Sequence, residues 1–132
     1  MPPKRTPLPV ELQRFCGEAG YPTVDGVLQL ELGDGREHRV KVVEVDADTL
    51  RVDAVVCHAS ALSGLDDVAL RVWRRNRGTR LVSFRIAQGG AVTGHAWVPR
   101  FALAADELAL YIKTVATECD RFEFLLTGQD LE

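Results

Sequence analysis

The sequence predicts an α+β domain: a five-stranded antiparallel sheet packed by three helices, in the order helix, three strands, helix, two strands, helix. Two hydrophobic periods predict this class. Five stretches have apolar residues at every second position and are separated by turn signals, which is typical of strands. The stretch after Pro99 has apolar residues at steps of three and four, which is typical of an amphipathic helix.

The first helix is predicted to begin at Pro9, because a proline in the first turn of a helix costs no hydrogen bond. The pattern ends at Gly20, and Tyr21-Pro22 opposes any continuation. The apolar residues of its core face are Leu8, Leu12, Phe15 and Ala19.

Three strands follow and are predicted to form an antiparallel meander. The first has Leu28, Leu30 and Leu32, and Gly33-Asp34-Gly35 predicts a hairpin turn after it. The return strand contains Val40, Val42, Val43 and Val45, and its adjacent valines at 42 and 43 indicate a bulge or burial on both faces. The third strand follows the turn at Asp46-Ala47-Asp48 and has Leu50, Val52, Ala54 and Val56 on one face.

The second helix is predicted from Ser63, a serine cap with an acid, Asp66, three residues later. Gly78 ends it. The residues of its predicted core face are Leu65, Val68, Ala69 and Val72. A hairpin follows, with a strand around Phe84, a turn at Gln88-Gly89-Gly90 and a return strand over 91–98.

The last helix has the clearest pattern in the chain. Asp106 and Glu107 stand in its first turn, where the helix dipole favours acids, and Gly128 supplies a left-handed stop. Its core face is predicted to contain Leu108, Ile112, Val115, Cys119 and Phe122.

Length and charge limit the function. The 132 residues fit one domain, which we expect over residues 8–128, between a disordered lead (1–7) and a short tail (129–132).

The formal net charge of −3 argues against a general binder of nucleic acid or membrane surfaces. No apolar run approaches the roughly 18 residues of a membrane helix. Without an export signal, and with an odd number of cysteines, we expect a reducing cytoplasm. The excess of arginine over lysine indicates a GC-rich bacterial genome.

Signatures of catalysis and of cofactors are absent from the sequence. No serine lies in a nucleophile elbow, and the paired acids are explained by helix starts. The three cysteines, Cys16, Cys57 and Cys119, form no C-x-x-C pair, and we expect buried structural thiols. Cys57-His58 is a possible start of a metal site, but no third or fourth ligand is identifiable. We therefore predict no catalytic residue, cofactor or metal.

The closing segment resembles the last helix of the YbjN-like proteins, which share the fold of type III secretion chaperones. The residues that carry this resemblance are Leu103-Ala104-Ala105-Asp106-Glu107-Leu108 and Ala116-Thr117-Glu118-Cys119-Asp120-Arg121-Phe122. The order of elements over about residues 8–128 is similar as well, although Cys119 stands where the family pattern has alanine. The resemblance implies a small cytoplasmic domain that forms homodimers, binds other proteins and is not an enzyme.

The second helix contains the candidate contact residues. Leu70 and Trp73 extend its apolar surface beyond the core face, which favours a dimer or partner contact. The alternative is a tryptophan folded over the edge of its own sheet. An arginine cluster follows the same helix: Arg71, Arg74, Arg75, Arg77 and Arg80. Guanidinium groups on one face suit an anionic partner, and the alternative is a solvated polar face.

We therefore expect a non-catalytic protein-binding homodimer of the bacterial cytoplasm, chaperone-like or an adaptor, that holds its protein client on exposed sheet edges and on the Leu70/Trp73 surface. The alternative is a nucleic-acid-associated module that uses Arg71, Arg74 and Arg75. The sequence does not identify the client.

Overall fold

A computed structural model describes residues 9–23, 27–32 and 37–128. The predicted α+β class and the order of elements are confirmed. The elements are α1 (Val10–Glu18), β1 (Val27–Glu31), β2 (Glu37–Glu44), β3 (Thr49–Cys57), a short 3-10 helix (Ala59–Leu62), α2 (Val68–Gly78), β4 (Ser83–Ile86), β5 (Val92–Pro99) and α3 (Ala105–Thr127). Within these ranges no helix combines the length and apolar character needed to cross a membrane.

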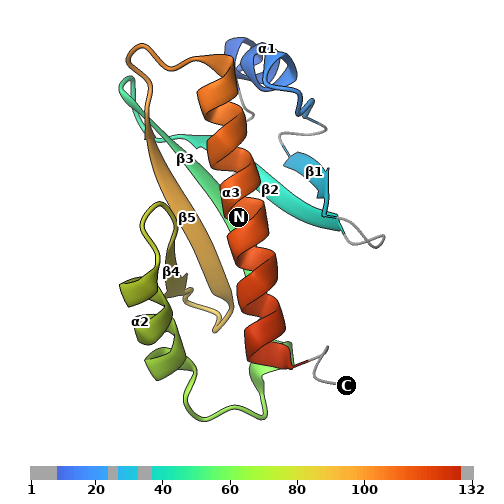
Figure 1. The fold of residues 1–132 in the computed structure, drawn as a ribbon, viewed down its shortest axis with the longest axis vertical. Helices are drawn as coiled ribbons and strands as arrows, with labels where there is room; N and C mark the ends of the chain where they lie inside the picture. The colour runs from blue at the N-terminus through green and yellow to red at the C-terminus, as the bar shows by residue number, and fades with distance from the viewer. Residues whose placement is uncertain (1–8, 24–26, 33–36, 129–132) are drawn as a thin grey trace, which may run out of the picture.

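The five strands form one antiparallel sheet in the order β1-β2-β3-β5-β4 (Figure 1). The predicted meander occupies one half of the sheet. The second hairpin joins it through β5, which pairs with β3 and leaves β4 at the edge. The predicted turn at Gly33-Asp34-Gly35 lies outside the described residues, as do Leu8 and the predicted lead and tail.

Helix α3 lies across the middle of the sheet and closes the core (Figure 1). All five residues of its predicted core face are buried: Leu108, Ile112, Val115, Cys119 and Phe122. They pack with the inward side chains of the strands, among them Leu50, Val52 and Val98, which have no exposed surface. The helix ends at Gly128, whose φ of 63° is left-handed as predicted. Burying each large apolar side chain contributes about 1.5–3 kcal/mol, so this stripe supplies much of the stability.

Of the two alternatives predicted at Val42–Val43, a bulge or burial on both faces, the structure shows the second. Strand β2 keeps a continuous register with both neighbours, and Val43 points to the second face of the sheet, where it is half-buried. The irregularity lies in β3, where the register with β5 shifts between Val55 and Cys57. That shift places the adjacent residues Val56 and Cys57 both in buried positions.

The predicted start of the second helix is wrong. The chain first forms the 3-10 helix Ala59–Leu62, and Ser63 continues that turn in a helical conformation instead of capping α2. The helix begins five residues later, at Val68, and only Val72 of the predicted core face is buried. The cause is Leu62, which is 6% exposed and anchors the loop in the core before α2 can begin. Helix α2 is therefore short and peripheral.

The three cysteines are free and buried, as the sequence predicts. Burial raises the pKa of Cys16 and of Cys57 to about 11, and that of Cys119 to about 12. The thiols are therefore protonated and unreactive at neutral pH, which fits a structural role.

Gly94 on β5 offers a direct test of the packing between α3 and the sheet. A Cβ at this position would overlap the Sγ of Cys119 and lie 3.1 Å from the ring of Phe84. We expect Gly94→Ala to lower the free energy of unfolding by about 1–3 kcal/mol, because overpacking forces these groups to move. Urea denaturation followed by far-ultraviolet circular dichroism measures the change.

The control is Gly17→Ala in α1, where a Cβ meets nothing within 4 Å. Alanine favours a helix interior, so this variant should gain about 0.5–1 kcal/mol. A Gly94→Ala protein as stable as the wild type contradicts the described packing.

Candidate protein-binding surfaces

Helix α2 presents the two predicted contact residues to solvent. Leu70 is 44% exposed and Trp73 is 57% exposed. The helix lies against β4 at the side of the molecule, away from α3 for most of its length (Figure 1). The alternative, a tryptophan folded over the edge of its own sheet, is therefore wrong. The ring instead packs against Arg77 of the same helix, whose guanidinium lies 5.0 Å from the ring centre. The apolar surface of α2 is available to a partner.

A side-chain amide fixes α2 to the edge of the sheet. The Nδ2 of Asn76 donates to the backbone O of Phe84 at 2.8 Å, and the backbone N–H of Phe84 donates to Asn76 Oδ1 at 2.7 Å. Asn76 thus takes the place of a neighbouring strand at this point of β4. The expectation that both sheet edges are open is corrected: β1 is the edge that α2 does not cover.

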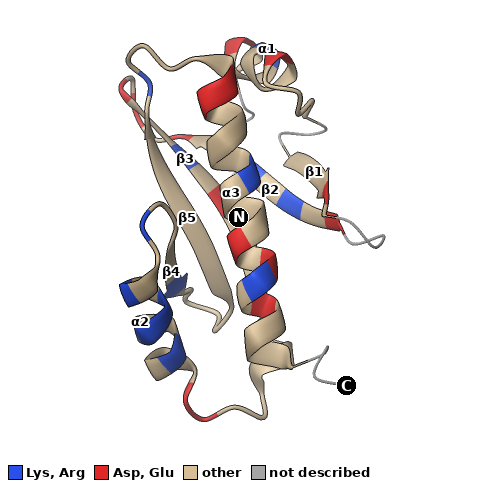
Figure 2. Ribbon diagram, viewed as in Figure 1, with Lys and Arg blue, Asp and Glu red and all other residues tan. Residues whose placement is uncertain are grey.

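The arginines of α2 do not form one free face. Figure 2 shows the basic residues along α2 and mixed charges along α3. Arg71 pairs with Asp67 at 3.0 Å on the same helix. Arg75 instead points to α3, where its Nη2 lies 3.0 Å from Oε2 of Glu118. Arg75 is therefore a structural residue that joins α2 to α3, and it does not belong to one free arginine face as expected. Arg74 is exposed.

A groove of about 550 Å³ lies between α2 and α3. Its walls combine arginines of both helices with the apolar side chains of Phe122 and Leu125. Glu118 sits in this groove and pairs with both Arg75 and Arg121, the latter at 3.5 Å. One carboxylate therefore already neutralises part of the basic charge, which weakens the case for a phosphate site.

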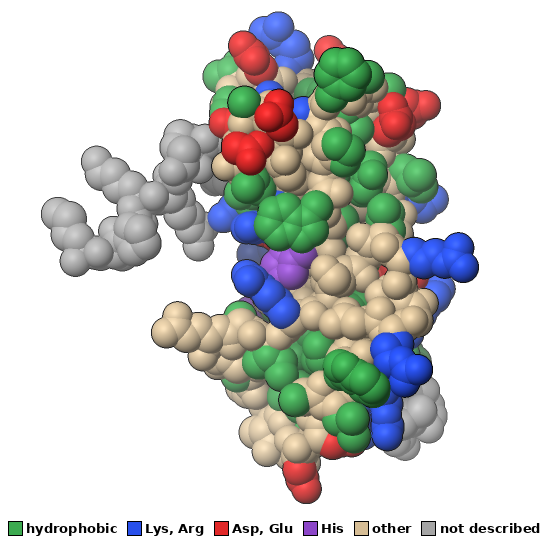
Figure 3. Space-filling view, turned by 90° about the vertical axis from the view of Figure 1, so that its left-hand side faces the viewer, with side chains coloured by type: hydrophobic (Ala, Val, Ile, Leu, Met, Phe, Trp, Pro, Cys, Tyr) green, Lys and Arg blue, Asp and Glu red, His purple; other side chains and the backbone are tan. Residues whose placement is uncertain are grey.

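The sheet face opposite α3 contains a surface that the sequence analysis missed. Trp97 of β5 is 56% exposed on this face and stacks with Arg51 of β3, whose guanidinium lies 5.5 Å from the ring centre. Val55, farther along β3 on the same face, is also exposed. Figure 3 views the molecule from the left of Figure 1 and shows hydrophobic side chains, a histidine and basic side chains across its middle. The alternation of side chains along a strand identifies these residues only when it is known which face of the sheet α3 leaves uncovered.

A polar network lies beneath this surface. Asp53 Oδ1 accepts hydrogen bonds from Arg51 Nε and from His95 Nδ1, both at 2.7 Å. On the other side of the imidazole, Arg85 Nε donates to His95 Nε2 at 3.1 Å, and the hydroxyl of Thr93 lies 2.8 Å from the same nitrogen. His95 is only 7% exposed, so the network is nearly enclosed.

The order acid, histidine, hydroxyl is that of a nucleophilic hydrolase. Here, however, the guanidinium of Arg85 engages the lone pair of His95 Nε2. An imidazole that already accepts from an arginine is a poor base for Thr93. The network therefore supports the exposed Trp97 and links β3, β5 and β4; it does not form a catalytic triad.

The network makes a prediction about pH. Burial alone would raise the pKa of Asp53, but the hydrogen bonds from His95 and Arg51 outweigh it and hold the pKa below the ordinary 3.8. Because the folded pKa is lower than the unfolded one, Asp53 stabilises the fold above about pH 4 and loses this contribution as pH falls through its folded pKa. Asp53→Asn should therefore be less stable than the wild type at pH 7, by about 1–3 kcal/mol. The difference should shrink below pH 4.

Urea denaturation between pH 2.5 and 7 measures this profile. The control is Glu44→Gln, which removes an exposed ion pair with Arg100 and should cost less than about 1 kcal/mol. A constant difference between Asp53→Asn and wild type at all pH values contradicts the role assigned to the carboxylate.

Comparisons with known proteins give similarity in structure alone. No protein-family model matches the chain, and no curated protein matches its sequence. Among solved structures, a chain of the ExsC–ExsE complex is similar with a TM-score of 0.61 and 15% identity, covering 92% of this chain and 97% of that chain. YbjN from E. coli has a TM-score of 0.55 and 12% identity, covering 92% and 90%. The Yersinia pestis type III secretion chaperone SycH, solved with a fragment of YscM2, has a TM-score of 0.53 and 12% identity, covering 82% and 92%.

These structural similarities establish the fold. At identities of 12–15%, they leave the function open. The resemblance to YbjN-like proteins and secretion chaperones is confirmed at this level. The chain has the α+β fold that type III secretion chaperones and YbjN share.

Proposed function

We propose that this protein is a non-catalytic protein-binding domain, chaperone-like or an adaptor, that acts as a homodimer in the bacterial cytoplasm. The observation that carries the proposal is the exposure of both tryptophans, Trp73 on α2 and Trp97 on the open sheet face, each more than half exposed. Tryptophan combines a large apolar ring with a polar N–H, and exposed apolar surface of this kind is typical of protein interfaces. SycH, which has the same fold, was solved with a protein fragment bound, and this supports the proposal.

The homodimer contact is assigned to α2. Leu70 and Trp73 stand one helical turn apart on its exposed side, and Ile86 of β4, the strand against which α2 packs, is 43% exposed. The two hydrogen bonds of Asn76 hold α2 against β4, so the helix presents Leu70 and Trp73 in a fixed orientation. Pre-organisation reduces the entropy lost on association.

The client is assigned to a different part of the molecule. Among the described residues, β1 pairs in the sheet with β2 alone, so its other edge offers backbone N–H and C=O groups for an added strand. Its apolar residues Leu28 and Leu30 are buried in the core and fix the strand in position. A client segment that pairs with β1 leaves α2 free for the dimer.

The dimer contact is tested by Trp73→Glu. A charge in a desolvated interface is unpaired, and loss of an interface tryptophan costs about 2 kcal/mol or more, so the dimer Kd should rise at least about thirtyfold. The monomer should stay folded, because a glutamate at 73 stands four residues before Arg77 and supports the helix. Light scattering coupled to size-exclusion chromatography measures the mass.

The matched control is Leu110→Glu on α3, which changes a side chain that is 62% exposed on another surface. This variant should remain a dimer. A wild-type protein that is monomeric at high concentration, or a Leu110→Glu variant that dissociates as much as Trp73→Glu, contradicts the assigned contact.

The nucleic-acid alternative depends on the arginines that remain exposed. Arg75 is excluded from this test, because its pair with Glu118 joins α2 to α3. For the double variant Arg71→Glu/Arg74→Glu we expect a nearly intact fold and no loss of DNA binding, because the wild type should bind single-stranded DNA negligibly. The net charge of −3 and the few available cations support that expectation.

Fluorescence anisotropy with a labelled oligonucleotide, at physiological salt and in a salt series, measures the binding. Micromolar affinity that falls steeply with salt and disappears in the double variant would replace the protein-binding proposal with the nucleic-acid one.

A further inference from the structure

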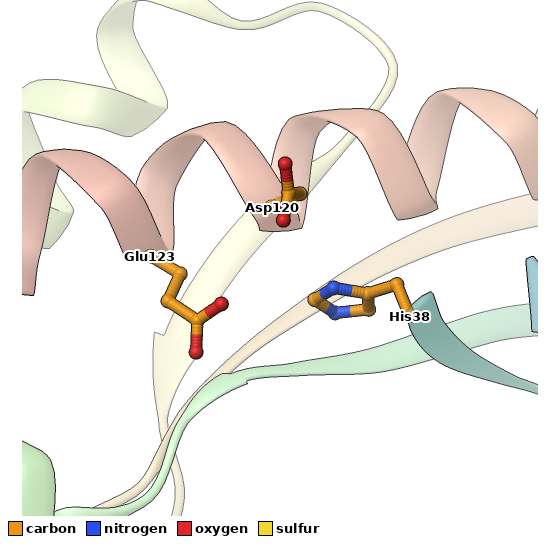
Figure 4. Close-up of side chains that lie close together, drawn as sticks. All are labelled: His38, Asp120 and Glu123. Atoms are coloured by element: carbon orange, nitrogen blue, oxygen red, sulfur yellow. The ribbon is translucent and has the colours of Figure 1, made fainter. Parts of the chain in front are cut away.

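Three potential metal ligands from distant parts of the sequence meet under α3. His38 lies on β2, and Asp120 and Glu123 lie on the C-terminal half of α3. One ligand atom from each residue lies within 4.8 Å of the other two. Figure 4 shows the imidazole between the sheet and the helix, with Asp120 on the helix side and Glu123 reaching from the helix toward the strands. The sequence gives no indication of this cluster, because neither segment has a metal-binding motif.

The hydrogen bond of His38 determines which ring nitrogen can bind a metal. Its Nε2 lies 2.9 Å from the backbone O of Val55. A carbonyl oxygen only accepts, so Nε2 carries a hydrogen, and in the neutral imidazole that binds a metal Nδ1 is the nitrogen with the lone pair. Figure 4 shows the ring nitrogens on opposite sides, one toward the strands and one toward α3. Metal-binding histidines are commonly oriented by this kind of hydrogen bond to a backbone carbonyl.

The elements that carry the three ligands are fixed in position. His38 is 8% exposed, and its neighbour on the same face of β2, Val40, is 1% exposed. On α3, the residue immediately before each acid is buried, Cys119 before Asp120 and Phe122 before Glu123, so the helix cannot rotate without disturbing the core. Asp120 and Glu123, three residues apart, share one side of the helix and are half-buried.

We propose that His38, Asp120 and Glu123 bind a first-row divalent transition-metal ion such as Zn²⁺. One imidazole nitrogen and two carboxylates suit zinc, whereas magnesium and calcium prefer oxygen ligands alone. Two ligands at about 2.1 Å from a tetrahedral zinc ion are about 3.4 Å apart. The observed limit of 4.8 Å therefore requires the ligand atoms to approach one another by up to about 1.4 Å, which rotation of the acid side chains supplies. The remaining coordination position takes water.

The bound ion joins β2 to the C-terminal half of α3. Helix α3 is the element that closes the core, so the ion stabilises the folded state through contacts that the unfolded chain lacks. This role is independent of the proposed protein binding. The proposal replaces the sequence-based expectation of a metal-free protein, which rested on the spacing of the cysteines and on the lack of further ligands near Cys57 and His58.

Titration calorimetry with zinc chloride, on protein first treated with a chelator, tests the proposal. The expected result is saturable binding of one zinc per chain and a melting temperature that rises with zinc. His38→Gln and Asp120→Asn should each weaken zinc binding by at least about tenfold, since even the partners of metal ligands contribute that much. Magnesium chloride should give no saturable heat.

Two matched controls separate this cluster from other zinc-binding groups. His58→Gln removes the exposed histidine beside Cys57, and Asp106→Asn removes an exposed acid at the start of α3. Both should bind zinc as the wild type does. Circular dichroism of the metal-free variants shows whether they are folded, and the half-buried position of Asp120 makes Asp120→Asn the safer variant. Absence of saturable zinc binding, or equal affinity in wild type and folded Asp120→Asn, overturns the proposal.

Discussion

The burial of one stripe of α3 against one face of the sheet is the contact on which the rest of this structure depends. The residues of this stripe between the ends of the helix have no exposed surface: Leu108, Ile112, Val115 and Cys119. The single long helix α3 covers the inner face of the sheet. The side chains of the opposite face are held in place by other contacts. The Asp53–His95–Arg51 network and the ring of Trp97 supply these contacts. Both ring nitrogens of His95 and the Oδ1 of Asp53 have hydrogen-bond partners, and such a network holds the open face in one arrangement.

The peripheral position of α2 follows from the same arrangement. With the core closed by α3, α2 buries only Val72, and polar contacts hold it in place: the Asn76 amide on β4 and the Arg75–Glu118 pair. These contacts occupy the polar side chains and leave Leu70 and Trp73 exposed. Because polar contacts hold α2 in place, the monomer does not depend on burying Leu70 and Trp73. Their exposure therefore costs the monomer little stability and leaves them available to a partner.

The sequence predicts the class, the order of elements and the α3 core face because these depend on hydrophobic period, which is local. It does not predict the order of strands in the sheet, since pairing of β5 with β3 is a long-range contact. It misplaces the start of α2, because Leu62 is anchored by tertiary packing that no local cap reveals. The role of Arg75 and the meeting of His38 with Asp120 and Glu123 likewise depend on how α3 crosses the sheet.

The central claim is that the Leu70/Trp73 surface of α2 is the homodimer interface. The chain has two tryptophans, so Trp97→Phe leaves Trp73 as the single tryptophan, whose emission reports on this surface. Its emission wavelength and its quenching by acrylamide are measured across a dilution series, together with the mass by light scattering. The account predicts that emission shifts to the blue and quenching falls as the dimer forms, because the indole leaves water. Dimer formation with Trp73 still emitting and quenched as a fully solvated indole would contradict it.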